Sequence, residues 1–552
     1  MSGVTADSAG TEPPGPAPPP ARAGPAGGRP GSDTGTWWAA HALVLVAFAA
    51  AALAPLHEMD LGQHLANGEW IWRHQAVPFT EPFAWTRAGQ PFYAYSWLPE
   101  LVYYALLRAF GPLGLHLLEG LIAAGAVAAL LWAGGRLGWP RPVRLGLAVL
   151  HLAAFWGVSA ALRPQQLLFI TVPLAWGVTA GLARAGPGAA RLLALAAVGA
   201  LAANTHIFFP LTAVPVGYWL IADRHERRWL LAGAALLAGW LVSPYGLVWP
   251  RVFALNFGHN IMLGQPPSIR ELMPGLDYAV HRPGAVIAGA ALLLAPWLGA
   301  PGERPRRARV ADALAWTAGL LLFAFAGRMV AAWWLVSLPL AGAAAARVLQ
   351  ATSARLRPRL ASSAALILGV LLLAAAAPPV RPRFWRFEGG TMPRMLPRVA
   401  EDPALWLPSW LLCNTRPGAH GRVFTEFNYG SELNWRLPGY SPSIDGRTIF
   451  PDSIAVDFSV QPAGRYRRHA ETWRSAELAL LDRSFWLAPV LDLAPDWVLL
   501  AHARRGPRGG SGALWAKRQW WQRWGTAGAR PALDVQVGDP RATCAASGKF
   551  PS

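Results

Sequence analysis

Long blocks of apolar residues, separated by short polar segments, fill the first two thirds of the chain. Blocks such as 37–56, 143–162 and 360–377 hold almost no charge over roughly 18 to 20 residues, which is about the length that a helix needs to cross the hydrocarbon core of a bilayer. The pattern predicts eleven membrane helices, at residues 37–56, 113–133, 143–162, 167–183, 192–203, 207–221, 229–242, 285–298, 310–325, 329–346 and 360–377. The predicted transmembrane domain therefore spans residues 36–377.

Arginine residues mark one side of this predicted bundle. Arg-rich loops follow every second helix, at residues 136–144, 184–191, 224–228, 304–309 and 347–359. Cytoplasmic loops of membrane proteins carry an excess of Lys and Arg, so we assign this side to the cytoplasm. The Pro-, Ala- and Gly-rich segment 1–35 is predicted to be a disordered tail on the same side. The long loop 57–112 is then the first outer loop of a multi-pass plasma-membrane protein.

The segment 378–552, after the last apolar block, has the pattern of a soluble α/β domain. Strand-like stretches lie at 422–427, 442–444 and 497–501, and a helical pattern lies at 471–485. An odd number of membrane helices places this domain on the extracytoplasmic side, whereas loss of the weakest helix, 192–203, would reverse that placement. Cys413 and Cys544 would form one disulfide there or remain two thiols.

The net charge of +19 changes this interpretation little. Nucleic-acid-binding domains gather basic residues on one face, whereas the arginines here lie between the apolar blocks. The bias toward Ala, Gly, Pro and Arg, with very little Lys, is also expected of a GC-rich genome. The sequence therefore predicts membrane lipid as a partner and no nucleic acid.

The first outer loop opens with two carboxylates and a histidine. Glu58, Asp60 and His64 follow the first apolar block, and His64 lies one helical turn after Asp60. One interpretation is that Asp60 activates an acceptor hydroxyl or, with Glu58, holds a divalent cation such as Mg or Mn against a phosphate. The other is that both acids cap an interfacial helix that contains Trp70 and Trp72. The spacing alone leaves both interpretations open.

Six polar side chains fall at the outer ends of other predicted helices, near the level at which Asp60 emerges. They are Arg163, Gln165, Asn204, His206, Tyr245 and Arg328. Ionisable side chains at membrane depth are costly and usually face a cavity or a pathway. Arg163 and Arg328 have the charge and the fork geometry to hold a lipid-linked phosphate, and the alternative is that they extend to lipid headgroups. We therefore predict that the six line a substrate site with Asp60.

The first outer loop carries a resemblance to a known superfamily. Residues 60–65 (Asp-Leu-Gly-Gln-His-Leu) and 68–71 (Gly-Glu-Trp-Ile) look like a recurring pattern in bacterial membrane proteins related to the GT-C glycosyltransferases. The resemblance implies that Asp60 serves as catalytic base or metal ligand, with Glu58 as the first acid of an acid-x-acid pair. It also places His64 in the substrate site.

A second resemblance lies in the C-terminal segment. Residues 425–430 (Thr-Glu-Phe-Asn-Tyr-Gly) and 444–447 (Ile-Asp-Gly-Arg) are similar in layout to the Trp-Trp-Asp-Tyr-Gly and Asp-Gly segments of oligosaccharyltransferase catalytic subunits. In this chain Glu426, Phe427 and Asn428 stand in place of the Trp-Trp-Asp. The residues that would read an Asn-glycosylation acceptor are thus replaced, so we do not expect protein N-glycosylation.

The apolar pattern and the resemblances together predict an α-helical polytopic membrane protein with about eleven transmembrane helices, a GT-C-like bundle and a C-terminal soluble α/β domain. The resemblances imply that a polyprenyl-phosphate-linked donor passes its sugar to a glycan, lipid or protein acceptor on the extracytoplasmic face. A transporter or flippase is one alternative, although it predicts Gly- or Pro-broken helices in paired halves, which the sequence does not display. A non-catalytic cell-envelope scaffold, in which the loop acids are incidental, is the other.

Overall fold

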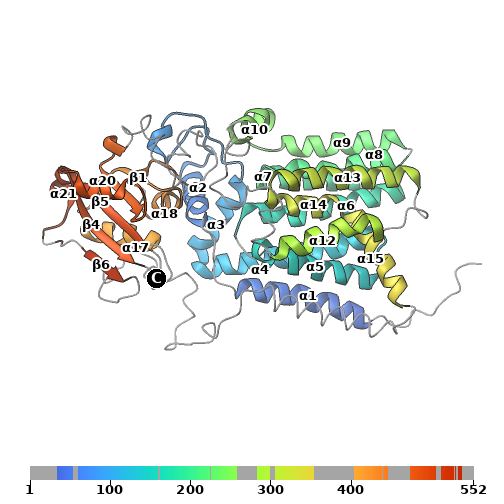
Figure 1. Ribbon diagram of the computed structural model, residues 1–552. Helices are drawn as coiled ribbons and strands as arrows, with labels where there is room; N and C mark the ends of the chain where they lie inside the picture. The colour runs from blue at the N-terminus through green and yellow to red at the C-terminus, as the bar shows by residue number, and fades with distance from the viewer. Residues whose placement is uncertain are drawn as a thin grey trace, which may run out of the picture.

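The structure is a computed structural model of the chain in which a helical bundle lies at one end and a domain with a β-sheet at the other (Figure 1). It describes residues 34–53, 60–159, 162–223, 225–257, 283–298, 305–353, 403–437, 439–445, 473–504, 511–527, 529 and 532–536. The first outer loop lies between the bundle and the sheet domain (Figure 1). The N-terminal tail predicted for residues 1–35 lies almost wholly outside the described residues.

The bundle is built from helices that lie side by side, most of them along its long axis (Figure 1). In the described residues they are α1 (Thr34–Ala52), α4 (Pro112–Arg136), α5 (Arg141–Ser159), α6 (Leu168–Ala185), α7 (Ala189–Thr205), α8 (Val214–Ala222), α9 (Glu226–Leu241), α12 (Pro283–Leu298), α13 (Arg306–Phe325), α14 (Val330–Val336) and α15 (Leu338–Ser353). Short helix α10 (Trp249–Phe257) follows α9 at a bend of 99°.

Ten of the eleven predicted apolar segments coincide with helices of the bundle, and the eleventh, 360–377, lies outside the described residues. Among the described helices, two are by themselves long and apolar enough to cross a membrane, Pro112–Arg136 and Pro164–Ala185. The number rises to at most four if each of two bent helix pairs is one span. The apolar segments were therefore predicted correctly as helices, whereas the count of eleven membrane spans is not confirmed.

One predicted helix, 329–346, is broken in the structure. Helix α14 ends at Val336, and α15 begins at Leu338 with a bend of 74°. The cause is Pro339, which has no N–H to donate to the carbonyl of Leu335 one turn earlier and whose ring crowds that carbonyl. The Leu335 carbonyl instead accepts a hydrogen bond from Nε1 of Trp176 on α6, at 2.9 Å. The break thus ties α14 to the middle of the bundle.

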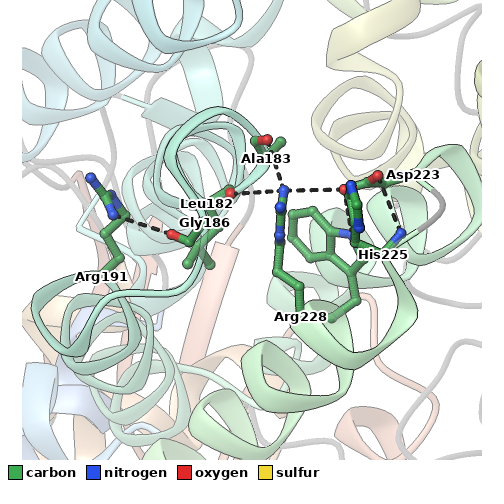
Figure 2. Close-up of polar contacts among 8 residues, drawn as sticks. Leu182, Ala183, Gly186, Arg191, Asp223, His225 and Arg228 are labelled. Atoms are coloured by element: carbon green, nitrogen blue, oxygen red, sulfur yellow. Dashed lines mark hydrogen bonds and ion pairs between the residues drawn. The ribbon is translucent and has the colours of Figure 1, made fainter.

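At the end of the bundle that lies away from the first outer loop, one arginine binds the last turn of α6 (Figure 2). Arg228 of α9 donates through Nη1 to the carbonyl oxygens of Leu182 and Ala183, at 3.2 and 2.8 Å. The same atom lies 3.3 Å from Oδ2 of Asp223, which also accepts from Nε1 of Trp229 at 3.1 Å. The last carbonyl oxygens of a helix have no N–H partner within the helix and carry partial negative charge. Arg228 supplies both a hydrogen-bond donor and a positive charge at this end of α6.

Replacing Arg228 by Met is expected to destabilise this end of the bundle by about 1.5–3 kcal/mol, the usual worth of hydrogen bonds to a charged group. Met retains most of the aliphatic stem but removes the charged donor from Asp223 and from the two carbonyls. The measurement is thermal unfolding of the detergent-solubilised protein. Arg227→Met is the matched control, because Arg227 is the preceding residue on α9 and is exposed. Equal midpoints for the two variants would contradict the assigned role of Arg228.

The first outer loop contains two helices, α2 (Leu61–His74) and α3 (Trp97–Phe110), and a 3-10 turn, η1 (Trp85–Arg87). Helix α3 ends at Gly111, whose φ of +61° is a left-handed conformation that favours glycine. Helix α4 then begins at Pro112, where the missing N–H costs no hydrogen bond. This Gly-Pro junction leads the chain directly from the loop into the bundle.

The C-terminal domain has a six-stranded sheet in the order β2-β1-β3-β5-β4-β6. The strands are β1 (Gly421–Thr425), β2 (Tyr440–Pro442), β3 (Leu478–Asp482), β4 (Trp497–Arg504), β5 (Ser511–Lys517) and β6 (Ala532–Gln536). The helices of the domain are α17 (Pro403–Asn414), α18 (Phe427–Arg436), α20 (Ala488–Leu493) and α21 (Arg518–Trp524). Strand β1 pairs in parallel with β2 and β3, whereas β5 is antiparallel to β3 and β4. The described part of the segment 378–552 thus holds both strands and helices.

The prediction of a helix at 471–485 is wrong. The described part of this segment holds a 3-10 turn, Trp473–Ser475, and then strand β3. Residues Leu478 to Leu481 are all buried, because β3 lies inside the sheet with side chains packed on both faces. A strand buried on both faces has a continuous apolar run instead of an alternating pattern, and such a run does not distinguish a strand from a helix.

The cysteine pairing left open by the sequence has one described member. Cys413 on α17 is disulfide-bonded. Cys544, the other cysteine of the sequence, lies outside the described residues.

The first outer loop covers one face of the sheet. Ile71 and Phe92 of the loop lie in one buried cluster with Phe424 and Trp515 of the sheet. The other face packs on α17 and α18. Hydrogen bonds join the same parts: Thr86 Oγ1 donates to the carbonyl of Ser443 at 2.5 Å, and the Ser441 hydroxyl donates to the carbonyl of Phe83. The loop and the C-terminal domain therefore share one core.

Candidate active site at the junction of the first outer loop and the C-terminal domain

Asp60 lies immediately before α2, at the N-cap position, and is half-buried. Its side chain makes no capping hydrogen bond to the helix, so the interpretation of Asp60 as a simple helix cap has no support in the geometry. The backbone N–H of His64 donates to the carbonyl of Asp60 at 3.0 Å. Residues four apart lie on one face of a helix, so His64 stands on the same side of α2 as Asp60.

A chain of side-chain hydrogen bonds runs from His64 into the C-terminal domain. Nδ1 of His64 lies 2.9 Å from Oε1 of Glu100 on α3, and Nδ2 of Asn67 donates to the same Oε1 at 2.9 Å. Nε2 of Gln63 donates to Oδ1 of Asn67 at 3.2 Å. Asn434 of α18 then donates through Nδ2 to Oε1 of Gln63, at 2.7 Å.

The chain ends at Asp445, which follows strand β2. Nδ2 of Asn434 donates to Oδ2 of Asp445 at 3.0 Å, in addition to its bond to Gln63. Asp445 is fully buried, and Glu100 and Asn434 are 3% and 4% exposed. The His64 side chain, by contrast, is 18% exposed. Because buried polar groups are costly unless they are hydrogen-bonded, this network binds α2, α3 and the C-terminal domain into one arrangement that reaches the surface at His64.

Two glycines allow the close approach of the elements that carry the network. A Cβ atom on Gly68 of α2 would lie 2.1 Å from the carbonyl oxygen of Glu100. A Cβ atom on Gly430 of α18 would lie 1.9 Å from the carbonyl oxygen of Ile444. Both distances are far below van der Waals contact, so only glycine fits at these positions without a shift of the backbone. Each glycine belongs to a segment that the sequence singled out.

The two C-terminal segments of the resemblance lie side by side in the fold. The Thr425 hydroxyl donates to the carbonyl of Ile444 at 2.9 Å, and the Thr425 N–H donates to the Ser443 hydroxyl at 3.0 Å. Burial, followed by the nearby Asp482 carboxylate, raises the pKa of Glu426 to about 7, while a hydrogen bond from the Asp482 N–H opposes the shift. The Phe427 and Asn428 side chains lie outside the described residues.

Arg163 and Gln165 lie near α2, in the short connection between α5 and α6. Arg163 precedes the 3-10 turn η2 (Pro164–Leu167), which contains Gln165, and both side chains are half-buried. Leu162, next to Arg163, shares a buried cluster with Leu61 and Leu65 of α2. The backbone therefore brings Arg163 to the helix that Asp60 precedes.

Asn204, His206 and Tyr245 contact the other side of the first outer loop. Oδ1 of Asn204 accepts from Nε1 of Trp97 at 2.8 Å, and its Nδ2 donates to the carbonyls of Ala200 and Val242. The rings of His206 and Tyr95 lie 5.8 Å apart. Tyr245 is 1% exposed and packs edge-on against Tyr93. All three residues thus brace the loop against the bundle, and their contact with a substrate stays a prediction.

Two predicted site residues are described only in part or not at all. The backbone of Arg328 lies in the 3-10 turn η7 (Gly327–Met329), and the neighbouring Met329 packs near Phe208, but the Arg328 side chain is outside the described residues. Glu58 is outside them entirely. In the part of the chain that the structure describes, no group of three or more His, Cys, Asp or Glu side chains could hold a metal ion. The Mg or Mn site involves Glu58 and stays a prediction.

The chain is similar to two solved structures. The arabinofuranosyltransferase AftD from Mycobacteria matches over 88% of this chain, with a TM-score of 0.51 and 16% sequence identity. This chain has the GT-C fold. It spans 40% of the length of AftD. ArnT from Cupriavidus metallidurans in the apo state matches 87% of this chain and 98% of its own, at 14% identity and a TM-score of 0.39. No protein-family model and no curated protein matches the sequence.

The network contains residues that the sequence analysis did not select. Glu100, Asn67 and Asn434 carry its central hydrogen bonds, although none was among the predicted site residues. One local signal was present: Glu100 is an acid in an aromatic and apolar stretch, and a buried acid needs a partner. Asn434 had no comparable signal, because its partner Gln63 lies 371 residues away.

Proposed function

We propose that this protein transfers a sugar from a polyprenyl-phosphate-linked donor to a glycan, lipid or protein acceptor on the extracytoplasmic face of the plasma membrane. The observation that carries the proposal is the position of Asp60 within a GT-C fold, one helical turn before His64 and its buried network. A half-buried carboxylate beside the junction of the membrane bundle and a soluble domain lies where a lipid-borne donor and a polar acceptor can both arrive.

The chemistry assigns one role to each group of residues. The acceptor hydroxyl gives its proton to a basic side chain of the site as its oxygen attacks the anomeric carbon, the bond from that carbon to the phosphate oxygen breaks, and the phosphate leaves with the electron pair. Asp60, with Glu58 before it, supplies the negative charge that activates the hydroxyl. Arg163 and Arg328 hold the phosphate, because a guanidinium matches phosphate oxygens in charge and fork geometry. Further predicted contacts to the substrates are His64, Gln165, Asn204, His206 and Tyr245.

A transporter is the second candidate, and one observation favours it. Two helix pairs are sharply bent, by 99° between α9 and the segment Gly246–Phe257 and by 74° between α14 and α15. Broken helices are a feature of secondary transporters, which place substrate sites at such breaks. The bend between α14 and α15 is explained by Pro339 and by the Trp176 hydrogen bond, which needs no bound substrate.

Deleting the gene is expected to make the donor lipid accumulate and to remove one surface glycan. The measurement is mass spectrometry of extracted lipids and surface glycans from wild-type cells, from the deletion strain and from that strain carrying the wild-type gene. A transferase predicts both changes and their reversal by the wild-type gene. Unchanged lipid and glycan profiles, in wild-type cells that contain the protein, would count against the transferase. A glycan lost together with an unglycosylated substrate that stays inside the cell would favour the transporter.

A further inference from the structure

The hydrogen bonds between Asp445 and His64 run in a single direction. Asn434 has two N–H groups on Nδ2, and these go to Asp445 and to Gln63. Because the Gln63 oxygen accepts from Asn434, the Gln63 NH₂ group faces Asn67 and donates to it. The Asn67 oxygen accepts there, so its own NH₂ group donates onward to Glu100. Each amide is thus held in one orientation by the one before it.

Glu100 receives the end of this chain. Its Oε1 atom accepts from Asn67 and lies 2.9 Å from Nδ1 of His64. With Glu100 as a carboxylate, which has no proton to give, the proton between Glu100 and His64 would lie on Nδ1. A neutral imidazole carries one N–H, which makes the other ring nitrogen, Nε2, the basic one. The second Glu100 oxygen, Oε2, is buried without a hydrogen-bond partner in the described residues.

We propose that His64 accepts the acceptor's proton at Nε2, and that Glu100 fixes its tautomer while the C-terminal domain holds Glu100 in place through Asn434. This inference rests on the proposed glycosyl transfer. In the step, the acceptor O–H bond breaks and its proton passes to Nε2 of His64, as the oxygen bonds to the anomeric carbon and the phosphate leaves with the electron pair of the broken bond. Asp60 and Glu100 place negative charge near the imidazolium that forms.

The positions of the groups support this division of work. His64 is the member of the network whose side chain is 18% exposed, whereas Glu100 and Asn434 are almost fully buried. A buried carboxylate that orients an imidazole, which in turn meets the substrate, is the arrangement by which a weak hydroxyl nucleophile is usually activated. His64 is therefore the catalytic residue of the proposal, and Glu100 and Asn434 are positioning residues.

The tautomer of His64 can be measured without knowing the substrates. Solid-state NMR of the full-length protein in lipid bilayers, with ¹⁵N-labelled histidine, separates a protonated Nδ1 from a protonated Nε2. The His64 signals are assigned as those lost in His64→Gln. Wild type is expected to show Nδ1 protonated, and Glu100→Leu is expected to lose this preference because the carboxylate acceptor is gone. A wild-type His64 that is protonated at Nε2 and not at Nδ1 would overturn the proposal.

The activity arm uses the donor lipid extracted from the deletion strain, supplied to membrane vesicles that contain the protein and the native acceptor. His64→Gln is expected to lower kcat by about 10²-fold or more, the usual worth of a positioned general base, with KM for the lipid extract little changed. Glu100→Gln is expected to act in the same direction. A wild-type kcat in His64→Gln would overturn the proposed role of His64. If Asp60→Asn is inactive in the same vesicles, the proposed glycosyl transfer itself still stands.

The contribution of the C-terminal domain has its own pair of variants. Asn434→Leu retains a similar volume but removes both N–H donors, so we expect kcat to fall while the folded protein remains in the membrane. Asn434→Gln keeps the amide and is expected to recover part of the rate. Equal wild-type rates for both variants would remove Asn434 from the proposal, and an equal loss in both would mean that packing, and not the amide, matters there.

Discussion

Replacing Asp60 by Asn is expected to abolish sugar transfer while expression and membrane insertion stay at wild-type levels. The amide has nearly the same shape as the carboxylate but lacks the negative charge that activates the acceptor hydroxyl, and loss of one such electrostatic group in an active site typically lowers a rate by about 10²–10³-fold. Helix α2 does not depend on the Asp60 side chain for a cap, so the fold should tolerate the change. The measurement is the rate at which vesicles consume the donor lipid extracted from a deletion strain.

The matched control is Glu226→Gln. Glu226 opens α9 at the opposite end of the bundle, is exposed, and loses the same single charge in the same kind of substitution. It should transfer sugar at the wild-type rate. An Asp60→Asn protein that also transfers at the wild-type rate, in vesicles containing equal amounts of protein, would remove the central claim about the site.

The bundle was predictable because apolar length is a local property. Ten apolar segments appear as helices, most of them within a few residues of the predicted bounds. The prediction missed the helix break at Ser337, which depends on a single residue. Pro339, two residues later, was a usable signal for it. It left α3 unassigned and offered α2 only as the interfacial helix of one interpretation, because their mixed polar and aromatic sequence has no long apolar run.

In the C-terminal domain, the strands depend on long-range pairing and were harder to predict from local sequence. Strand β1 was predicted close to its observed place, whereas β3 was assigned to a helix, since a run such as Leu478 to Leu481 is apolar throughout. Only the neighbouring strands β1 and β5, which come from either side of it in the sequence, make that run a central strand. The packing of the first outer loop on one face of the sheet could not be predicted either. Phe92 and Phe424 belong to one buried cluster although more than three hundred residues separate them in the sequence.

Within the candidate site, the residues predicted from the sequence are reactive groups, whereas those added by the structure position other side chains. Asp60 and His64 were selected for their chemistry, which the sequence displays directly. Glu100 and Asn434 act through hydrogen-bond partners on other elements, so the sequence offered only the apolar setting of Glu100 as a signal and none for Asn434. The shared core of the loop and the C-terminal domain explains why these partners are held within hydrogen-bond distance. The geometry of the site is thus a property of two segments folded together.

Gly68→Ala is expected to reduce both stability and transfer, which tests whether the close approach of α2 and α3 is needed. The added Cβ would lie 2.1 Å from the Glu100 carbonyl oxygen and 2.8 Å from Cβ of Tyr104, so α3 must move away from α2. Over-packing of this kind costs about 1–3 kcal/mol. Because the shift displaces Glu100 from His64 and Asn67, the transfer rate should fall further than the loss of folded protein explains.

Gly233→Ala separates this steric effect from the ordinary effect of the substitution. Gly233 lies within α9, and a Cβ there meets nothing within 4 Å, so the change should stabilise that helix by roughly 0.5–1 kcal/mol. Thermal unfolding midpoints of the two variants in detergent, with rates in vesicles normalised to folded protein, are the measurements. Opposite shifts in the midpoint, with a rate loss confined to Gly68→Ala, would show that the contact between α2 and α3 sets the position of Glu100. A Gly68→Ala protein with the midpoint and rate of the control would mean that the site does not depend on this contact.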